Sequence, residues 1–120
     1  MRFGMELSSI QRIECIRIED HEGWHGWQSI PGAVIGTWHG EQATRITGLL
    51  DGLSECGLTR CFLPGYGIRA YDAERLALEV AFCFRCDNLL VLGGGANDLR
   101  GFKTKNRKAQ HLLRAFQAWG

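Results

Sequence analysis

Three cysteines in the second half of the chain are the residues whose type and spacing most readily suggest chemistry. Cys83 and Cys86 form a CxxC pair, and Cys61 lies upstream. Such a pair carries out redox chemistry at a helix N-terminus, and thiolates hold zinc where roughly four nitrogen or sulfur ligands converge. Here the pair falls in a predicted strand, and the sequence has no second CxxC. We therefore expect buried free thiols and no cofactor. Three alternatives stay open: a dithiol redox pair, a disulfide from Cys61, and a zinc module built on Cys61, Cys83 and Cys86.

Two histidines stand close to carboxylates near the start of the chain. His21 and His25 are four residues apart, beside Asp20 and Glu22. On a helix this spacing would form a metal-binding face, but the glycines of the same stretch favour a loop. No Ser-His-Asp or Cys-His order with supporting elements is recognisable, and the carboxylates form no paired acid and base. We therefore predict that the protein is not an enzyme.

The stretch 20–32 is predicted as a loop because it combines glycine, proline, histidine and tryptophan without any period. Its two tryptophans either fold back onto the core or remain outside as anchors for a partner, since tryptophan is enriched at binding hot spots. Acidic residues gather at its beginning. The predicted partner-binding surface comprises Glu19, Asp20, Glu22, Trp24, His25 and Trp27.

Basic residues cluster at the start of the last predicted helix. The cluster comprises Arg100, Lys103, Lys105, Arg107 and Lys108. Positive charge at this end opposes the helix dipole, so the cluster suggests an anionic partner, either an acidic protein surface or a phosphate. The formal charge of the whole chain is only +1, so a general footprint for nucleic acid is missing and nucleic acid is not the partner we expect.

The elements that position these residues are indicated by hydrophobic periodicity. Strands are predicted at 12–19 and 33–38, and apolar spacings of three and four predict helices at 41–55 and 106–119. The alternation of the first strand slips between Cys15 and Ile16, which indicates either a bulge or a strand covered on both faces. Thr104 is the predicted N-cap of the last helix.

The stretch 60–92 is predicted to form three antiparallel strands. Even-numbered residues from Leu76 to Cys86 are apolar and define one buried face. If the preceding strand buries its even residues on the same face, the turn at 72–75 needs three or five residues. Asp87 and Asn88 are expected to make a second tight turn, which would place Leu89 and Val91 beside Phe84 and Cys86. Residues 93–105 are predicted as a mobile loop. Their glycines do not have the spacing of a P-loop, so the sequence does not predict a phosphate-binding loop here.

The predicted fold is therefore α+β. It comprises an antiparallel four- to five-stranded sheet, in the order β-β-α-β-β-β-α, with both helices on one face. The length of 120 residues indicates a single domain, with a core at about 10–119 and a flexible tail at 1–9. No stretch approaches the roughly 20 apolar residues of a membrane span, and the N-terminus lacks the apolar core of a signal peptide. An odd number of cysteines fits a reducing compartment, so we expect a cytoplasmic protein that makes no membrane contact.

The pattern Cys61-Phe62-x-Pro64-x-Tyr66-Gly67-Ile68-Arg69, followed by Cys83-Phe84-x-Cys86, resembles a family of small uncharacterised bacterial proteins with a CFxPxxGIR…CFxC core. The resemblance covers about residues 36–116 and implies one helix before the core and one after it. Tyr66 stands where the family often has histidine, which argues against a histidine ligand there.

Small bacterial α+β proteins of this kind are often immunity partners of toxins, an analogy at the level of the fold. The expected function is a non-enzymatic protein-binding domain, most concretely an immunity-type inhibitor that binds and neutralises a bacterial toxin domain. The alternatives are a zinc- or thiol-dependent module and, more weakly, a phosphate or nucleic-acid binder that uses residues 100–108.

Overall fold

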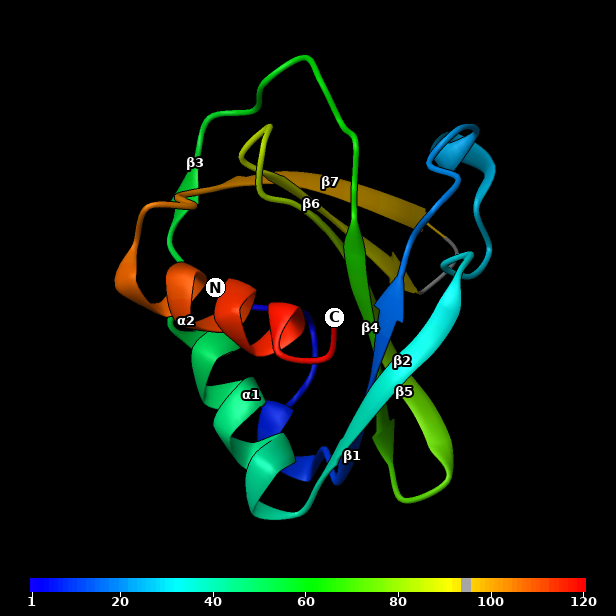
Figure 1. Cartoon of the computed structure of the whole chain (residues 1–120), viewed down its shortest axis with the longest axis vertical. Coiled ribbons are helices and arrows are strands. Elements are labelled where there is room, and N and C mark those ends of the chain that lie inside the picture. Colours follow the sequence, from blue (N-terminus) through cyan, green and yellow to red (C-terminus); the bar gives the residue numbers. More distant parts are fainter. Residues whose placement is uncertain (94–95) are drawn as a thin grey trace.

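One antiparallel sheet and two α-helices make up the protein (Figure 1). The computed structural model describes residues 1–93 and 96–120. The elements in chain order are the 3-10 turn η1 (Leu7–Ser9), β1 (Arg12–Arg17), the 3-10 turn η2 (Trp24–Gly26), β2 (Ala33–His39), α1 (Glu41–Asp51), β3 (Glu55–Cys56), β4 (Tyr66–Asp72), β5 (Arg75–Cys83), β6 (Asn88–Gly93), β7 (Ala96–Phe102) and α2 (Arg107–Gln117). Hydrogen bonds join seven described strands in the order β2-β1-β4-β5-β6-β7-β3. The predicted α+β class is confirmed, but the predicted number and order of strands are not.

Both helices cover the same face of the sheet, as predicted. In Figure 1 the sheet curves around the pair. The core between them includes Ala43, Ile46 and Leu50 of α1, Ala109, Leu112 and Phe116 of α2, and Ile13, Ile68, Val80, Phe82 and Leu89 of the sheet. Full burial of a leucine, isoleucine or phenylalanine side chain contributes about 1.5–3 kcal/mol, so packing on this face is a large stabilising contribution. The spacings of three and four that predicted the helices are the positions that make this contact.

The first helix is shorter than predicted. It ends at Asp51, where the N–H of Gly52 donates to the Gly48 carbonyl oxygen and the N–H of Leu53 donates to the Leu50 carbonyl oxygen, both at 3.2 Å. The chain then turns into β3, whose Cys56 pairs with Gly101 of β7. A Cβ on Gly101 would lie 2.5 Å from the Cys56 carbonyl oxygen, so only glycine allows β3 to approach this closely. Of the residues expected to continue the helix, 52–54 turn the chain and only Glu55 enters the extra strand.

The last helix begins at Arg107 rather than Asn106, and the prediction of Thr104 as its cap is wrong. The side chain of Asn106 accepts the N–H of Lys108 at 2.8 Å and so caps the helix. Thr104 is buried, and its hydroxyl donates to the carboxylate of Asp87. Asn106 is as good a cap as threonine, so the two positions could not be separated by residue type alone.

Strand β7 occupies residues that were predicted to be a mobile loop. It pairs with β6 from Gly93↔Ala96 to Asn88↔Gly101. Asparagine, aspartate and glycine are weak strand formers, which hid this strand from a reading of propensity. Residues 94 and 95, part of the predicted glycine loop, lie outside the described residues.

The register of the central hairpin is as predicted, but its turn is not. Ile68 pairs with Val80, and Ala70 pairs with Leu78, so even residues face even residues. Asp72 pairs with Arg75, which leaves a two-residue turn instead of the expected three or five. A register shift between Ala70 and Tyr71 restores the parity by leaving one extra residue on β5.

The second turn of the hairpins, unlike the first, is longer than predicted. β5 ends at Cys83, and the four residues 84–87 form the turn before Asn88, which pairs with Cys83. Leu89 therefore lies opposite Phe82 and Val91 opposite Val80. The alternation of apolar residues continues in the sequence beyond the end of β5, so the partners predicted for Leu89 and Val91 were wrong.

Strand β1 is covered on both sides of the sheet, and its neighbour β2 contains a bulge. The pairing with β2 shifts between Cys15 and Ile16, as the slip in the alternation indicated. Cys15 belongs to the helix-side core, whereas Ile16 belongs to a second core on the opposite face. This second core consists of Ile16, Ile18, Ile30, Phe62, Ala81, Cys83, Cys86, Leu90 and Leu92. The interpretation of a strand covered on both faces is therefore confirmed, whereas the bulge lies in β2, where Ile35 is the extra residue, and not in β1 itself.

The first nine residues, expected as a flexible tail, lie against the rest of the domain. Phe3 is buried in the helix-side core, and the guanidinium of Arg100 lies 5.7 Å from the centre of its ring.

Neither described helix is long and apolar enough to cross a membrane.

Candidate functional site

The loop between β1 and β2 covers the second core on the face of the sheet away from the helices (Figure 1). We call residues 19–30 the β1–β2 loop. Trp24 and Trp27 are half-buried and pack against the second core, and the Trp24 ring meets Phe62 edge-on at 5.1 Å. The indole N–H of Trp27 donates to the carbonyl oxygen of Glu22 at 3.3 Å. Of the two roles that the sequence left open for these tryptophans, packing onto the core is the one the structure shows.

The charged residues of the β1–β2 loop remain on the surface. Glu19, Asp20, Glu22 and His25 are all exposed. None of the three carboxylates forms an ion pair within the described part of the chain. Asp20 accepts the backbone N–H of Glu22 at 3.1 Å, which closes a local turn. The loop thus presents three adjacent negative charges that the domain itself does not neutralise.

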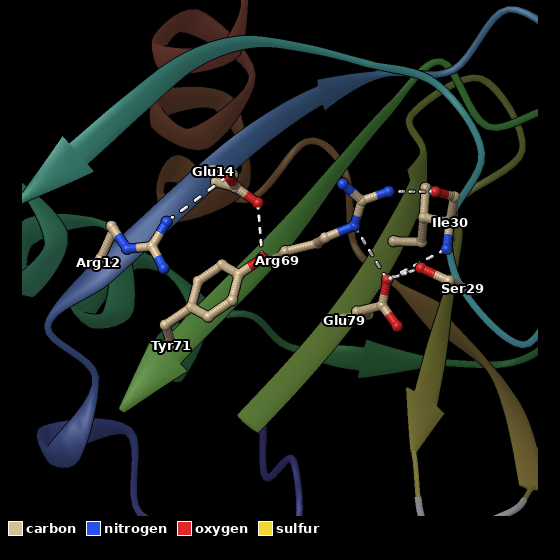
Figure 2. Close-up of polar contacts among 7 residues, drawn as sticks. All are labelled: Arg12, Glu14, Ser29, Ile30, Arg69, Tyr71 and Glu79. Atoms are coloured by element: carbon tan, nitrogen blue, oxygen red, sulfur yellow. Dashed lines mark hydrogen bonds and ion pairs between the residues drawn. The ribbon is translucent and has the colours of Figure 1, made fainter. Parts of the chain in front are cut away.

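One end of the loop is held by a buried ion pair, shown in Figure 2. Arg69 of β4 and Glu79 of β5 are cross-strand partners, and the Arg69 Nε lies 3.2 Å from the Glu79 Oε1. The same carboxylate oxygen accepts the Ser29 hydroxyl at 2.7 Å and the Ile30 N–H at 3.1 Å. The guanidinium also donates to the Ile30 carbonyl oxygen at 2.6 Å. The sheet therefore binds the loop backbone at both the N–H and the carbonyl of one residue.

This arrangement makes the end of the loop hard to release. Glu79 is only 5% exposed, and a buried carboxylate is stable only when charged and polar partners replace its water. Ser29 and Ile30 supply two of these partners. Moving the loop away would leave the Glu79 carboxylate short of hydrogen bonds inside the protein.

A single asparagine holds the other part of the loop. The side-chain amide of Asn97, on β7, donates to the carbonyl oxygens of Trp24 at 3.2 Å and Trp27 at 3.1 Å. These two carbonyls flank the turn η2 and have no strand partner of their own. The loop is consequently fixed to the sheet at two separate places, although it contains no regular strand or long helix.

A second polar group lies further along β4, between this strand and β1 (Figure 2). Tyr71 donates its hydroxyl to the Glu14 Oε1 at 2.8 Å, and the Arg12 guanidinium lies 3.9 Å from the centre of the Tyr71 ring. Burial and then the hydrogen bond to Glu14 raise the pKa of Tyr71 above its usual value. Tyr71 therefore stays a neutral donor, and the Glu14 carboxylate has partners within the sheet.

Two of the three cysteines singled out by their spacing are joined. Cys61 and Cys86 form a disulfide with a Cα–Cα distance of 5.6 Å. Cys83 remains a buried thiol, and its sulfur accepts the N–H of Cys86 at 3.2 Å and that of Leu63 at 3.4 Å. The disulfide alternative is thus the one found, while the CxxC pair itself is not bonded. Within residues 1–93 and 96–120, no three His, Cys, Asp or Glu side chains lie together as a metal site.

The state of the thiols predicts a simple labelling result. Cys56 is exposed, whereas Cys15 and Cys83 are buried, and burial raises the pKa of Cys15 to about 12. We expect a thiol reagent to label Cys56 alone in the native protein and three cysteines after unfolding without reductant. Intact mass gives the count, and prior reduction of the unfolded chain should raise it to five. A second fast-reacting thiol in the native protein, or five labels without reductant, would contradict these assignments.

The basic cluster divides into one residue used by the fold and four on the surface. Arg100 lies 2.7 Å from the Asp98 carboxylate and donates to the Arg2 carbonyl oxygen. The exposed members are Lys103, Lys105, Arg107 and Lys108, and none of them forms an ion pair in the described chain. Lys103 and Lys105 line a pocket of about 460 Å³, and Asp87 also lines it. Anion binding by this segment stays a prediction.

The placement of Lys108 offers a physical reason for part of this positive charge. A Cβ on Gly52 would lie 2.7 Å from the Cγ of Lys108, so the lysine side chain lies over the C-terminal end of α1. Positive charge is favourable at a helix C-terminus because the macrodipole is negative there. The positive charge of Lys108 is unfavourable at the N-terminus of α2, but its favourable interaction with the C-terminus of α1 offsets part of that cost.

Sequence reasoning missed the residues that hold the β1–β2 loop. Glu79 carried a usable signal, because it is the single charge in the apolar stretch 76–84 and must find a partner. Its partners at Ser29 and Ile30 are about fifty residues away in sequence, a distance over which periodicity says nothing. Asn97 carried no signal, since it lies in residues that read as a loop.

No protein-family model, curated protein or solved structure matches the chain. The resemblance to the family with the CFxPxxGIR…CFxC core therefore stays a prediction, as do the function and the cytoplasmic location that were expected from the sequence.

Proposed function

We propose that this protein is a non-enzymatic binding domain whose β1–β2 loop contacts a basic surface on a protein partner. The observation that carries the proposal is the contrast within the loop. Its backbone is fixed by Glu79, Arg69 and Asn97, while the carboxylates at its start form no ion pair in the described chain. A fixed backbone with unpaired charges is what a preformed recognition surface requires.

A loop fixed before binding gives affinity because less conformational entropy is lost on association. Each side chain or backbone segment that must be ordered on binding weakens the complex, and here the ordering is provided by folding. The three carboxylates would also attract a basic partner from a distance and raise the association rate, an effect that weakens as salt is added. The half-buried Trp24 and Trp27 stabilise the loop in this arrangement by packing against the second core.

The most specific form of the proposal is an immunity-type inhibitor. The partner would be a bacterial toxin domain with a basic functional surface, and Glu19, Asp20 and Glu22 would occlude that surface together with the exposed His25. An acidic loop is chemically suited to this role, since a domain that binds phosphates or nucleic acid must present positive charge. Under this proposal the bound toxin meets the inhibitor in the cytoplasm.

The proposal predicts that neutralising the loop charges abolishes capture of the partner. We expect the triple substitution Glu19→Gln, Asp20→Asn and Glu22→Gln to lose the proteins that the wild-type chain recovers in a pull-down from the host cell. The measurement is quantitative mass spectrometry of the recovered proteins, followed by co-expression of each candidate with the wild-type or the substituted chain.

A matched control removes the same charges from elsewhere on the surface. Glu41→Gln, Asp51→Asn and Glu74→Gln change three exposed residues outside the loop by the same net charge. This control chain should recover the partner as well as wild type does. Equal recovery by all three chains would refute the loop as the contact surface. Failure of the wild-type chain to protect cells from any recovered protein would refute the immunity-type role.

A further inference from the structure

A pocket of about 400 Å³ lies between the two helices and the edge strand β2, away from the β1–β2 loop. Its walls come from Trp38 of β2, Arg45 of α1 and, from α2 and the residues after it, His111, Arg114, Ala118 and Trp119. The volume is within the range of small-molecule sites, roughly 300–1,000 Å³. Its size thus suits a single flat ring system with a substituent.

Two indole rings form the apolar wall. Trp38 is 7% exposed and Trp119 is 41% exposed, and their ring centres are 5.8 Å apart at an interplanar angle of 57°. Trp38 also packs against Phe116 of the helix-side core, which holds it in place. Among the described residues, Trp119 is one of five large apolar side chains that are exposed, so covering its ring with a ligand would be favourable.

The position of Trp119 is set by a glycine on β2. A Cβ on Gly36 would lie 2.1 Å from the Cδ2 of Trp119, so the indole ring lies directly on the strand backbone at this residue. On the other side, Ala115 and Ala118 contribute only small side chains to the pocket wall. Together these residues keep a space beside the Trp119 ring that a larger residue would fill.

The polar wall is entirely basic. Arg45 and Arg114 are exposed and His111 is half-buried, and no acidic residue lines the pocket. In the described chain, none of these three side chains forms an ion pair or donates a hydrogen bond to another residue. Guanidinium groups bind carboxylate and phosphate oxygens through paired hydrogen bonds, which are stronger than those between neutral groups.

From the aromatic and the basic wall together, we infer that this pocket binds a small aromatic anion, a molecule with a flat ring and one carboxylate or phosphate. The ring would stack on Trp119, and the anionic group would bind Arg45 and Arg114. Both walls are needed, so a ring without charge or an anion without a ring should bind much more weakly. This inference does not depend on the proposed function, because no residue is shared with the β1–β2 loop.

The test is isothermal titration calorimetry of the full chain with two probes, adenosine monophosphate and indoleacetate. We expect at least one to bind, and to bind about tenfold or more tightly than its controls adenosine, inorganic phosphate, indole and acetate. The probe that binds more tightly identifies the anionic group as phosphate or carboxylate. Binding of neither probe, or binding of each probe no tighter than that of its own controls, would overturn the inference.

Substitutions locate the binding. Arg45→Gln with Arg114→Gln should weaken it about tenfold or more, whereas Arg75→Gln with Arg85→Gln removes the same charge from exposed positions outside the pocket and should leave it unchanged. Gly36→Ala should also weaken binding, because it displaces Trp119 while every basic group remains. Equal losses from the two double substitutions would show general charge attraction and contradict a site in this pocket.

Discussion

Replacing Glu79 by alanine is expected to lower the free energy of unfolding by about 3 kcal/mol, the low end for breaking a buried ion pair. The substitution leaves the Arg69 guanidinium without its carboxylate, although that side chain is 21% exposed and keeps some access to water. It also removes the acceptor of the Ser29 hydroxyl and the Ile30 N–H. The β1–β2 loop should therefore loosen as well as the fold.

Two measurements separate these effects. Urea unfolding gives the loss of stability, and amide hydrogen exchange over residues 20–30 reports opening of the loop. Glu74→Ala, which truncates an exposed glutamate in the β4–β5 turn, is the matched control and should change stability by less than about 0.5 kcal/mol. If Glu79→Ala behaves like this control in both measurements, the buried ion pair does not hold the loop.

Removing the disulfide is expected to have a comparable effect on stability. Cys61 and Cys86 are 25 residues apart, and a cross-link of that length stabilises the fold by about 3–4 kcal/mol through the unfolded chain. We expect reduction, or Cys61→Ala with Cys86→Ala, to lower the urea midpoint accordingly. Cys56→Ala is the control, because this exposed thiol has no disulfide partner and should leave the midpoint almost unchanged.

An unchanged urea midpoint after reduction, with loss of the bond verified by intact mass, would contradict this expectation. The bond also bears on location. Reducing systems in the cytoplasm keep most protein thiols reduced. If the predicted cytoplasmic location holds, the chain would carry Cys61 and Cys86 as thiols there and lose this part of its stability.

The parts of the fold that followed from the sequence are those set by local periodicity. The apolar spacing of Ala43, Ile46 and Leu50 placed α1 on the core. The alternation predicted the buried face of β5 correctly at Leu78, Val80 and Phe82, but not at Leu76, which is 44% exposed. The slip after Cys15 marked a real irregularity. Each of these signals depends on neighbours within about one turn of helix or a few residues of strand.

The parts that could not be predicted depend on tertiary pairing. Strand β7 exists because β6 offers it hydrogen bonds, and its own residues are poor strand formers. The two-residue turn at 73–74 was missed because a bulge elsewhere in the hairpin corrects the register. Such compensations cannot be read from one strand alone.

The candidate site was likewise predicted in part. The acidic residues of the β1–β2 loop could be identified by their charge, and they are exposed. The contacts that fix the shape of the loop could not be predicted, because Arg69, Glu79 and Asn97 reach the loop from three different strands. The pocket at Trp38 and Trp119 was also missed, since it forms only when β2, α1 and α2 meet.

Calorimetric titration of the recovered partner against the wild-type chain and the Glu19→Gln, Asp20→Asn, Glu22→Gln variant, at low and at high salt, tests the proposed binding surface most directly. We predict that the wild-type affinity falls as salt rises and that the variant binds about tenfold or more weakly at low salt. An equal affinity of both chains, with no dependence on salt, would show that the partner binds elsewhere on the domain.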